Sequence, residues 1–494
     1  MFQRFRKAHP KDRDLPPRAH EIALLTSVLD GTLYDILPHT FDEEYNESGE
    51  YVPIQKRAPS VRYSLCRTVV DDSISLLFGN GRFPEIEAES DGARAAIADL
   101  VKQSQIAHSL SEAAFFGSTG SVAVLMLVLA GVVHWVPMPT THLIPQFDPL
   151  SPKTLISVTQ RYKISRDDVA AMGYTKLAAD NNDIRDWWYQ RTWDDMADWQ
   201  FVPIPTTVEN PEKMEIDAAK SVEHGLGFCP VVWIKNLFGP SATGSPVDGA
   251  CTFRAAIDTG IEIDYQLSQV GRGLKYSSDP MLMIKDPGDL DGQAITRGGG
   301  QALTVAAGGD AKMLEINGGG SNAVIEYVRT LRELALESIH GNRASPEQLS
   351  GAASGRALEL MNQGLIWLAD NLRTTYGDGG VLPLIKMVAM ASQKMPIKIA
   401  GKVIKIDPSE QFSLRWPPWY PKTAIERGQD ADTVVKLVNG DVISTETATK
   451  FVARDYGVMD PNAERQTIVA DNAAAAAAFV AQGAQIKVKE IAPA

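Results

Sequence analysis

Cysteine is scarce in this sequence, and its spacing excludes two common kinds of site. The chain has three cysteines in 494 residues and no C-x-x-C pair. Thiols this few and this far apart are typical of reduced, buried side chains in a cytosolic setting, so we expect neither a disulfide framework nor a zinc site. The three residues are Cys66, Cys229 and Cys251.

The sequence also lacks the motifs of common phosphate-binding, nucleophilic and metal-dependent enzymes. The glycine runs 298–300 and 318–320 lack the lysine and hydroxyl residue of a phosphate-binding loop. Segment 351–355 reads G-A-A-S-G and differs from the nucleophile elbow G-x-S-x-G by one position. The eight histidines never occur in H-E-x-x-H or H-x-H spacing. We therefore predict no catalytic residues, no metal and no cofactor, and expect that the chain is not an enzyme.

Long hydrophobic runs are missing as well. The most apolar stretch, 122–136, is shorter than the ~20 residues of a membrane-spanning helix, and Gly131 and His134 interrupt it. Its β-branched residues on either side of Ala130-Gly131 favour a buried β-hairpin. Basic residues near the start of the chain are not followed by an apolar stretch, as they would be in a secretory signal. We therefore expect no membrane partner.

The charge balance restricts the nucleic-acid interpretation. A net charge of −13 argues against a general nucleic-acid coat, which would carry a basic domain. It does not exclude a protein that surrounds DNA without binding it tightly. The apolar content of 44% and the charged content of 22% are ordinary for a folded protein, and the length exceeds that of one compact core.

Three segments with apolar residues three and four apart predict long α-helices. They are 247–274, with Asp248 as N-cap, 322–340 and 354–376. Residues 377–380, Gly-Asp-Gly-Gly, predict a firm end to the third helix. The stretch 341–353 is rich in Gly, Ser, Asn and Pro, which predicts a mobile loop between the last two helices.

Shorter elements complete the predicted order. The region 120–235 is β-rich and holds four clustered tryptophans, which we interpret as ordinary hairpin and inter-subunit packing in preference to a carbohydrate- or partner-stacking platform. The tryptophans are Trp187, Trp188, Trp193 and Trp199. Further helices are expected at 21–37, 60–78, 91–116, 423–439 and 444–456, with an alanine-rich helical tail through 473–478. Further strands are expected at 155–162, 186–192, 200–204, 229–235, 281–284, 302–305, 313–316, 397–399, 402–406 and 412–416.

Four motifs, in order along the chain, resemble those of one family. They are 62–79 (RYSLCRTVVDDSISLLFG), 225–236 (GLGFCPVVWIKN), 349–360 (LSGAASGRALEL), and 439–447 (NGDVISTET) with Asp-Pro-Asn-Ala-Glu at 460–464. Together they are similar to the motifs of the portal proteins of tailed bacteriophages. A portal is the ring at a capsid vertex through which DNA is packaged and released.

The resemblance implies an α+β portal fold with an elongated subunit. Its implied parts are a wing at 18–246, stem helices at 247–277 and 321–340, a small β-containing clip at 278–320, a tunnel loop at 341–353, the long helix and remaining wing at 354–429, and a helical crown and tail at 430–494. The polar residues 1–17 are expected by composition to form a flexible N-terminal arm before these parts. The predicted break at 377–380 departs from the family, whose long helix is continuous or only kinked.

The resemblance also implies partners and site residues. The chain would form a homo-oligomer, a dodecamer in the virion, that surrounds double-stranded DNA without sequence preference. It would meet the terminase large subunit, the head–tail adaptor, and the major capsid and scaffold proteins, at the capsid vertex and in the host cytoplasm during assembly. The DNA-channel residues would be Asn342, Arg343, Ser345, Glu347, Gln348 and Ser350. The stem-assembly residues would be Ile257, Ile263, Leu267, Val270, Val328 and Leu331.

One alternative of another class stays open at this point. A multidomain cytosolic enzyme with an unrecognised active site would have the same composition. The mass in solution discriminates between the two hypotheses, because a portal forms a large ring and an enzyme more often a monomer to tetramer.

Overall fold

The computed structural model gives an α+β protein whose chain divides into two compact units. Unit 1 comprises Met1–Arg343 and Asn362–Pro417, and unit 2 comprises Ala344–Met361 and Pro418–Ala494. Each unit is considered by itself. The structure describes residues 1–12, 15–79, 81–180, 183–207, 214–278, 281–285, 310–314, 319–341, 359–360, 362–419, 424–453, 458 and 461–489.

The first helix corrects one expectation. Helix α1 (Phe2–Ala8) buries Phe2 and Phe5 against the rest of unit 1, and the backbone N–H of Phe2 donates to Asp258 at 2.7 Å. The prediction of a flexible arm at 1–17 is therefore wrong for α1. Two phenylalanines three residues apart give the segment an apolar face, which its many basic residues obscured.

The next helices are shorter than expected, because backbone breaks interrupt them. Helix α2 (Pro17–Leu29) ends before Gly31, whose φ of 72° turns the chain away. The segment 91–116 contains two helices, α4 (Asp91–Ser104) and α5 (Ile106–Gly117), since Gln105 between them adopts a left-handed conformation. Helix α3 (Leu65–Phe78) begins five residues later than expected but ends before Gly79 as predicted.

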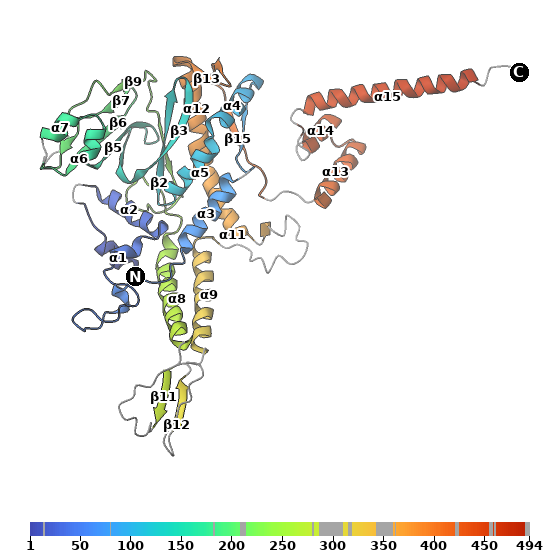
Figure 1. Cartoon of the computed structure of the whole chain (residues 1–494). Coiled ribbons are helices and arrows are strands. Elements are labelled where there is room, and N and C mark those ends of the chain that lie inside the picture. Colours follow the sequence, from blue (N-terminus) through green and yellow to red (C-terminus); the bar gives the residue numbers. More distant parts are fainter. Residues whose placement is uncertain are drawn as a thin grey trace. The chain divides into compact units, whose positions relative to one another are not determined.

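The predicted hairpin is confirmed. Strands β2 (Ser121–Leu129) and β3 (Val132–Pro139) pair antiparallel, and the turn between them places Ala130 and Gly131 at positive φ. Strand β10 (Val231–Lys235) pairs with the other edge of β2 and completes a three-stranded sheet. Helix α5 packs against β2 and β3 (Figure 1).

A second sheet of six strands buries the tryptophan cluster. Its order is β4-β5-β6-β7-β9, with β8 paired to β6. Trp187, Trp188 and Trp193 are buried within the chain, which confirms packing within the sheet for these three, whereas Trp199 is half-buried. The single strand predicted at 200–204 is wrong, because Pro203 and Pro205 lack N–H donors for a continuous ladder. The strands are β4 (Leu143–Phe147), β5 (Leu155–Ser165), β6 (Asp186–Trp193), β7 (Ala197–Gln200), β8 (Ile204–Pro205) and β9 (Val222–Glu223).

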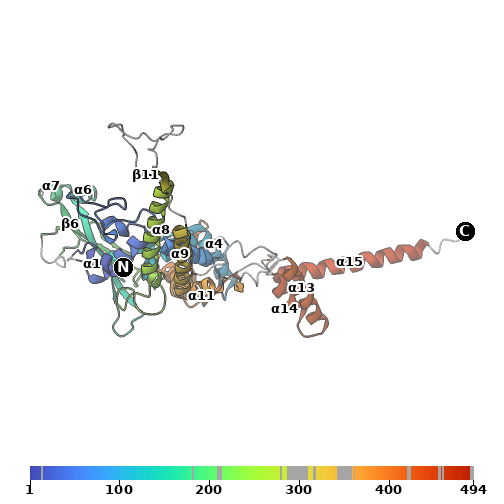
Figure 2. The ribbon, with the colours of Figure 1, turned by 90° about the horizontal axis from the view of Figure 1, so that it is seen from below.

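Two long antiparallel helices follow the sheets. Helix α8 (Ile257–Ser278) and helix α9 (Gly319–Ser338) lie side by side in both views (Figures 1 and 2). Between them in sequence, β11 (Met281–Lys285) pairs antiparallel with β12 (Asp310–Leu314). The strand predicted at 302–305 lies outside the described residues. Helix α8 begins about ten residues later than the sequence predicts.

The long helix is not broken where the sequence predicts. Helix α11 (Gln363–Leu372) continues through a π-helical segment, η7 (Arg373–Val381), into α12 (Leu382–Lys394). The glycines of η7 serve close packing instead. A Cβ on Gly377 would lie 2.8 Å from Trp416 Cζ2, and one on Gly380 would lie 2.8 Å from Ile234 Cδ1. The predicted start at 354–358 lies outside the described residues.

The last strands and helices of the chain agree with the sequence prediction to within a few residues. In unit 1, β1 (Glu85–Ala88) pairs with β15 (Phe412–Arg415), and β13 (Ile397–Ile399) pairs with β14 (Lys402–Ile404). Unit 2 contains three helices among its described residues: α13 (Ala424–Asn439), α14 (Thr445–Ala453) and α15 (Pro461–Lys489), the last including the alanine run.

Candidate assembly surface

The helix pair α8–α9 carries the six predicted stem-assembly residues, and α8 is held to the rest of unit 1 by a buried polar network. Asp264 accepts hydrogen bonds from the Tyr34 hydroxyl at 2.7 Å and the Tyr63 backbone N–H at 2.8 Å. Ser268 Oγ accepts from the backbone N–H of Val61 at 3.0 Å. One side of α8 is therefore fixed against the segment between α2 and α3.

Burial sets the protonation of this network. Removal from water raises the pKa of the Asp264 carboxyl, although its hydrogen bonds from Tyr34 and Tyr63 act in the opposite direction. Burial, together with the nearby Asp264, raises the pKa of the Tyr34 hydroxyl. Tyr34 therefore stays protonated, and its hydroxyl donates a hydrogen bond to Asp264.

A second buried centre lies where the sequence predicts a helix cap. Asp248 does not cap α8; its carboxylate is 4% exposed and accepts from Arg18 Nε at 2.6 Å and Nη2 at 2.8 Å. Ser121 and Thr243 donate to the same carboxylate at 2.5 and 2.6 Å. The N-cap prediction is wrong because this side chain joins α2, β2 and the loop before α8, a use that local spacing cannot reveal.

The stem-assembly residues divide into two groups. Ile257 and Ile263 are buried within the chain itself, so they belong to the core of unit 1 and are not presented to a neighbouring molecule. This corrects their assignment as assembly contacts. The other four are half-buried, so part of each side chain is exposed and accessible to a neighbouring subunit. These four are Leu267, Val270, Val328 and Leu331.

Exposed apolar side chains on the pair were not among the predicted site residues. Tyr327 and Leu334 lie seven residues apart on α9, and are 48% and 55% exposed. This spacing places them on one flank of the helix, beside Leu331. Ile325 is 37% exposed and, two residues before Tyr327, lies on a different flank. Contiguous exposed apolar groups with polar surroundings mark contact surfaces.

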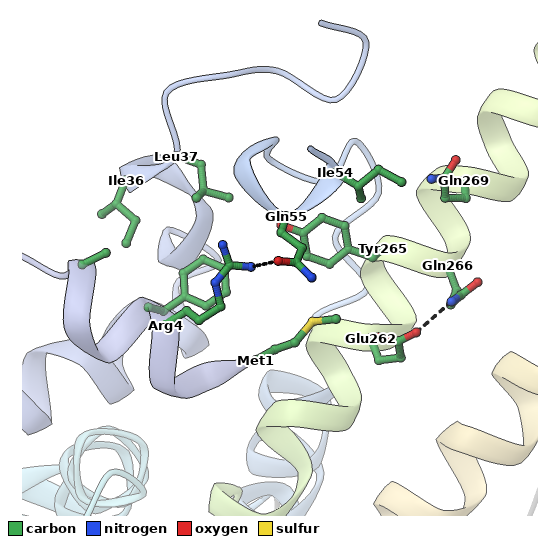
Figure 3. A pocket seen from close by; sticks show the side chains of 12 residues that line it. Met1, Arg4, Ile36, Leu37, Ile54, Gln55, Glu262, Tyr265, Gln266 and Gln269 are labelled. Carbon is green, nitrogen blue, oxygen red and sulfur yellow. Dashed lines mark hydrogen bonds between the residues drawn. The ribbon is translucent and has the colours of Figure 1, made fainter. Parts of the chain in front are cut away.

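A pocket of about 420 Å³ opens beside α8 (Figure 3). Its apolar lining comes from α1, the η1 turn (Leu33–Ile36) and the η2 turn (Ile54–Lys56). Arg4 donates to Gln55 at 2.6 Å, and Gln266 donates to Glu262 at 2.7 Å. The lining residues used below are Arg4, Phe5, Ile54, Gln55, Gln266 and Gln269. The pocket could not be predicted from the sequence, because the polar residues 1–17 indicated a flexible arm in place of α1.

The six predicted DNA-channel residues lie outside the described residues. The start of their loop is fixed, however. His340 adopts a left-handed conformation, and the Gly341 N–H donates to the Leu336 carbonyl at 2.8 Å. A Cβ on Gly341 would lie 2.8 Å from Val69 Cγ2, so α9 ends in close contact with α3.

The prediction that the cysteines are buried is confirmed for Cys66, Cys229 and Cys251, which are free thiols. Burial raises the pKa of the Cys229 and Cys251 thiols to about 12. Across the described ranges, His, Cys, Asp and Glu side chains nowhere gather in a group of three that could hold a metal ion. In the part of the chain that the structure describes, every helix is too short or too polar to span a bilayer.

Comparisons with known proteins find similarity only among solved structures. No protein-family model matches the chain, and no curated protein matches it. Among solved structures, a chain of the "Virion of native gene transfer agent (GTA) particle" is similar over 79% of this chain and 89% of that chain, with 12% identity and a TM-score of 0.37. At this identity and score the likeness assigns no role to the chain.

Proposed function

We propose that the chain is the subunit of a portal ring, the channel for packaging and ejection of double-stranded DNA at a capsid vertex. The observation that carries the proposal is the helix pair α8–α9, which is joined through the hairpin β11–β12 and exposes Leu274, Tyr327 and Leu334. A single copy leaves these side chains in water. Copies packed side by side would cover them, and a closed ring leaves no apolar edge free.

The motifs that resemble those of portal proteins have structural roles that support the proposal. Asn236, which ends the second motif, donates from Nδ2 to the Ala250 carbonyl at 2.9 Å and to Thr252 Oγ1 at 2.8 Å. Its Oδ1 accepts from the Tyr376 hydroxyl of the long helix at 3.2 Å. This one side chain therefore connects β10, the approach to α8 and the long helix.

The last motif marks helix starts in unit 2. Ser444 Oγ accepts from the Thr447 N–H at 3.1 Å at the beginning of α14, and Pro461 opens α15. A hydroxyl at the N-cap accepts a hydrogen bond from one free N–H group of a helix start, and a proline in the first turn removes another such N–H group.

The proposal assigns the remaining roles by resemblance. Helices α8 and α9 form the stem, residues 278–320 form the clip that meets terminase and the head–tail adaptor, and 341–353 faces the channel. Capsid and scaffold proteins contact the ring in the virion. No specific observation among the described residues favours the enzyme alternative.

Electron microscopy of the purified full chain, with its mass in solution, tests the proposal. The expected result is a closed ring with a central channel, of about twelve copies by family resemblance. A chain that stays monomeric at micromolar concentration across several salt concentrations contradicts it.

A pair of matched variants sharpens this test. Leu334→Asp places a charge on the exposed flank of α9 and should reduce ring formation while the thermal midpoint of the subunit is kept. Leu150→Asp, at an exposed leucine between β4 and β5, is the control and should leave the rings intact. Normal rings from Leu334→Asp would remove this flank of α9 from the assembly surface.

A further inference from the structure

We propose that the pocket beside α8 receives Tyr327 from α9 of the adjacent copy. This inference rests on the proposed ring and names the residues that join one subunit to the next. One chain carries two surfaces on opposite sides of α8: the pocket, and the exposed apolar side chains of α9. The inference is based on their positions, their levels along the helix pair and their chemistry.

The two surfaces are placed for a head-to-tail contact. Helix α1, which helps to line the pocket, and helix α9 flank α8 on opposite sides in both views (Figures 1 and 2). Tyr327 therefore cannot enter the pocket of its own chain. A contact between two different surfaces, repeated around an axis, closes into a ring.

The heights of the two surfaces along the helix pair agree. Tyr327 lies eight residues from the hairpin end of α9, and Val270 lies eight residues from the hairpin end of α8. Leu334 lies four residues from the other end of α9, which corresponds to Ile261 on α8. The α8 residues that line the pocket, from Glu262 to Gln269, fall between these two levels. Rotation about an axis parallel to the helices keeps these levels in register.

The chemistry of the pocket suits a tyrosine. Phe5 and Ile54 provide apolar surface for an aromatic side chain. The amides of Gln55, Gln266 and Gln269 can form hydrogen bonds with a phenol hydroxyl (Figure 3). A volume of about 420 Å³ lies within the range of pockets that take small ligands. Tyrosine is enriched as an interface anchor because one end is apolar and the other bonds to polar groups.

The charges beside the two surfaces are complementary. On the pocket side, α1 carries basic residues and no acidic one, and its Arg4 and Lys7 are exposed, while Glu262 of α8 is the acidic residue of the lining. On α9, Glu326 and Glu333 lie beside the apolar strip and are exposed, and Glu326 also pairs with Arg329 at 2.8 Å. Opposite charges at the rim of a contact favour this pairing over other orientations.

Disulfide cross-linking of full-length chains tests the contact. The variant Gln55→Cys/Tyr327→Cys places one thiol at the pocket and the other on α9, and oxidation should yield a ladder of covalent multimers on a denaturing gel. The native cysteines are buried. The single variant Gln55→Cys measures the background of cross-linking that does not involve a thiol at position 327. Gln55→Cys/Ile325→Cys is the matched control, because Ile325 lies on a different flank of α9.

The outcomes separate this inference from the proposed ring. Rings that fail to cross-link through Tyr327→Cys, or that cross-link through Ile325→Cys instead, overturn the inference and leave the ring intact. A chain that forms no multimer overturns both. A ladder specific to Tyr327→Cys supports the pocket contact.

Truncation provides an independent measurement. Tyr327→Ala should raise the concentration of half-assembly by roughly tenfold or more, as removal of an interface anchor does, while the thermal midpoint of the subunit stays unchanged. Tyr327→Phe keeps the aromatic side chain and loses only the hydroxyl, so it should raise the concentration of half-assembly less. Assembly of Tyr327→Ala at the wild-type concentration would overturn the inference.

Discussion

Single buried polar side chains hold distant parts of unit 1 together. Asp248 and Arg18 are 230 positions apart in sequence, yet they form a bidentate ion pair in which the Arg18 side chain is 10% exposed. Arg18 also donates to the carbonyls of Thr140 and Leu143. The pair thereby joins α2, β2, β4 and the approach to α8.

This centre predicts a large effect from one substitution. Asp248→Ala leaves the Arg18 guanidinium buried without its counter-charge, and removal of one partner of a buried pair costs about 3 kcal/mol or more of unfolding free energy. Thermal unfolding followed by tryptophan fluorescence measures it, since eight of the nine tryptophans lie in unit 1. Asp91→Ala, which removes the surface partner of Arg94, is the control and should change the midpoint little. Equal midpoints for the two variants would contradict the role assigned to Asp248.

At the residue scale, the sequence identifies which side chains are buried better than it identifies their partners. The cysteines and the β6 tryptophans are buried as composition and strand periodicity predict. The partners of Asp248, Asp264 and Asn236 come from elements more than a hundred positions away or from loops. Periodicity contains no information on such contacts, because tertiary packing alone brings the groups together.

At the element scale, a glycine run predicts a helix end only when its tertiary contacts are also known. The Gly-Asp-Gly-Gly run at 377–380 satisfies the usual rule for a helix end, but the chain continues as a π-helix. The rule fails because Gly377 and Gly380 lie against Trp416 and Ile234, where any side chain would collide. The packing that holds the helix together through these glycines is absent from local sequence. Elements with a clear period or a firm turn, such as α9 and the β2–β3 hairpin, are predicted to within a few residues.

Two glycines of this segment allow a matched test. Gly377→Ala places a Cβ within 3.0 Å of both Trp416 and Leu414, and overpacking of this kind costs about 1–3 kcal/mol. Gly379→Ala meets no atom closer than 4.0 Å, and alanine stabilises a helix relative to glycine by up to about 1 kcal/mol. The thermal midpoint should therefore fall for Gly377→Ala and rise slightly for Gly379→Ala. A rise for both would show that the glycines are not packing requirements.

At the scale of the whole molecule, the sequence predicts fold class and element order, whereas the assembly surface emerges only from three-dimensional placement. The pocket depends on α1, η1, η2 and α8, four elements from separate parts of the chain. The apolar strip that could fill the pocket lies on α9 and is exposed. Its residues Tyr327 and Leu334 are not among the predicted stem-assembly residues. Residues that face the inside of one chain and residues that face a neighbour have the same apolar character, so sequence periodicity does not separate Ile263 from Leu334.

The charge of the whole chain predicts how the proposed ring would bind DNA. Each copy carries a net charge of −13, so a ring of copies would be strongly acidic overall, which disfavours tight phosphate contacts. A duplex that must slide is served by weak contacts, since phosphate binding dominates non-specific affinity. Assembled rings should bind duplex DNA with a dissociation constant weaker than about 10 μM at ~150 mM salt, near the middle of the range for non-specific binding. Fluorescence anisotropy with a labelled duplex measures this, and a scrambled duplex of equal length is the control. Submicromolar binding, or a preference for either sequence, would contradict passage of DNA through a weakly interacting channel.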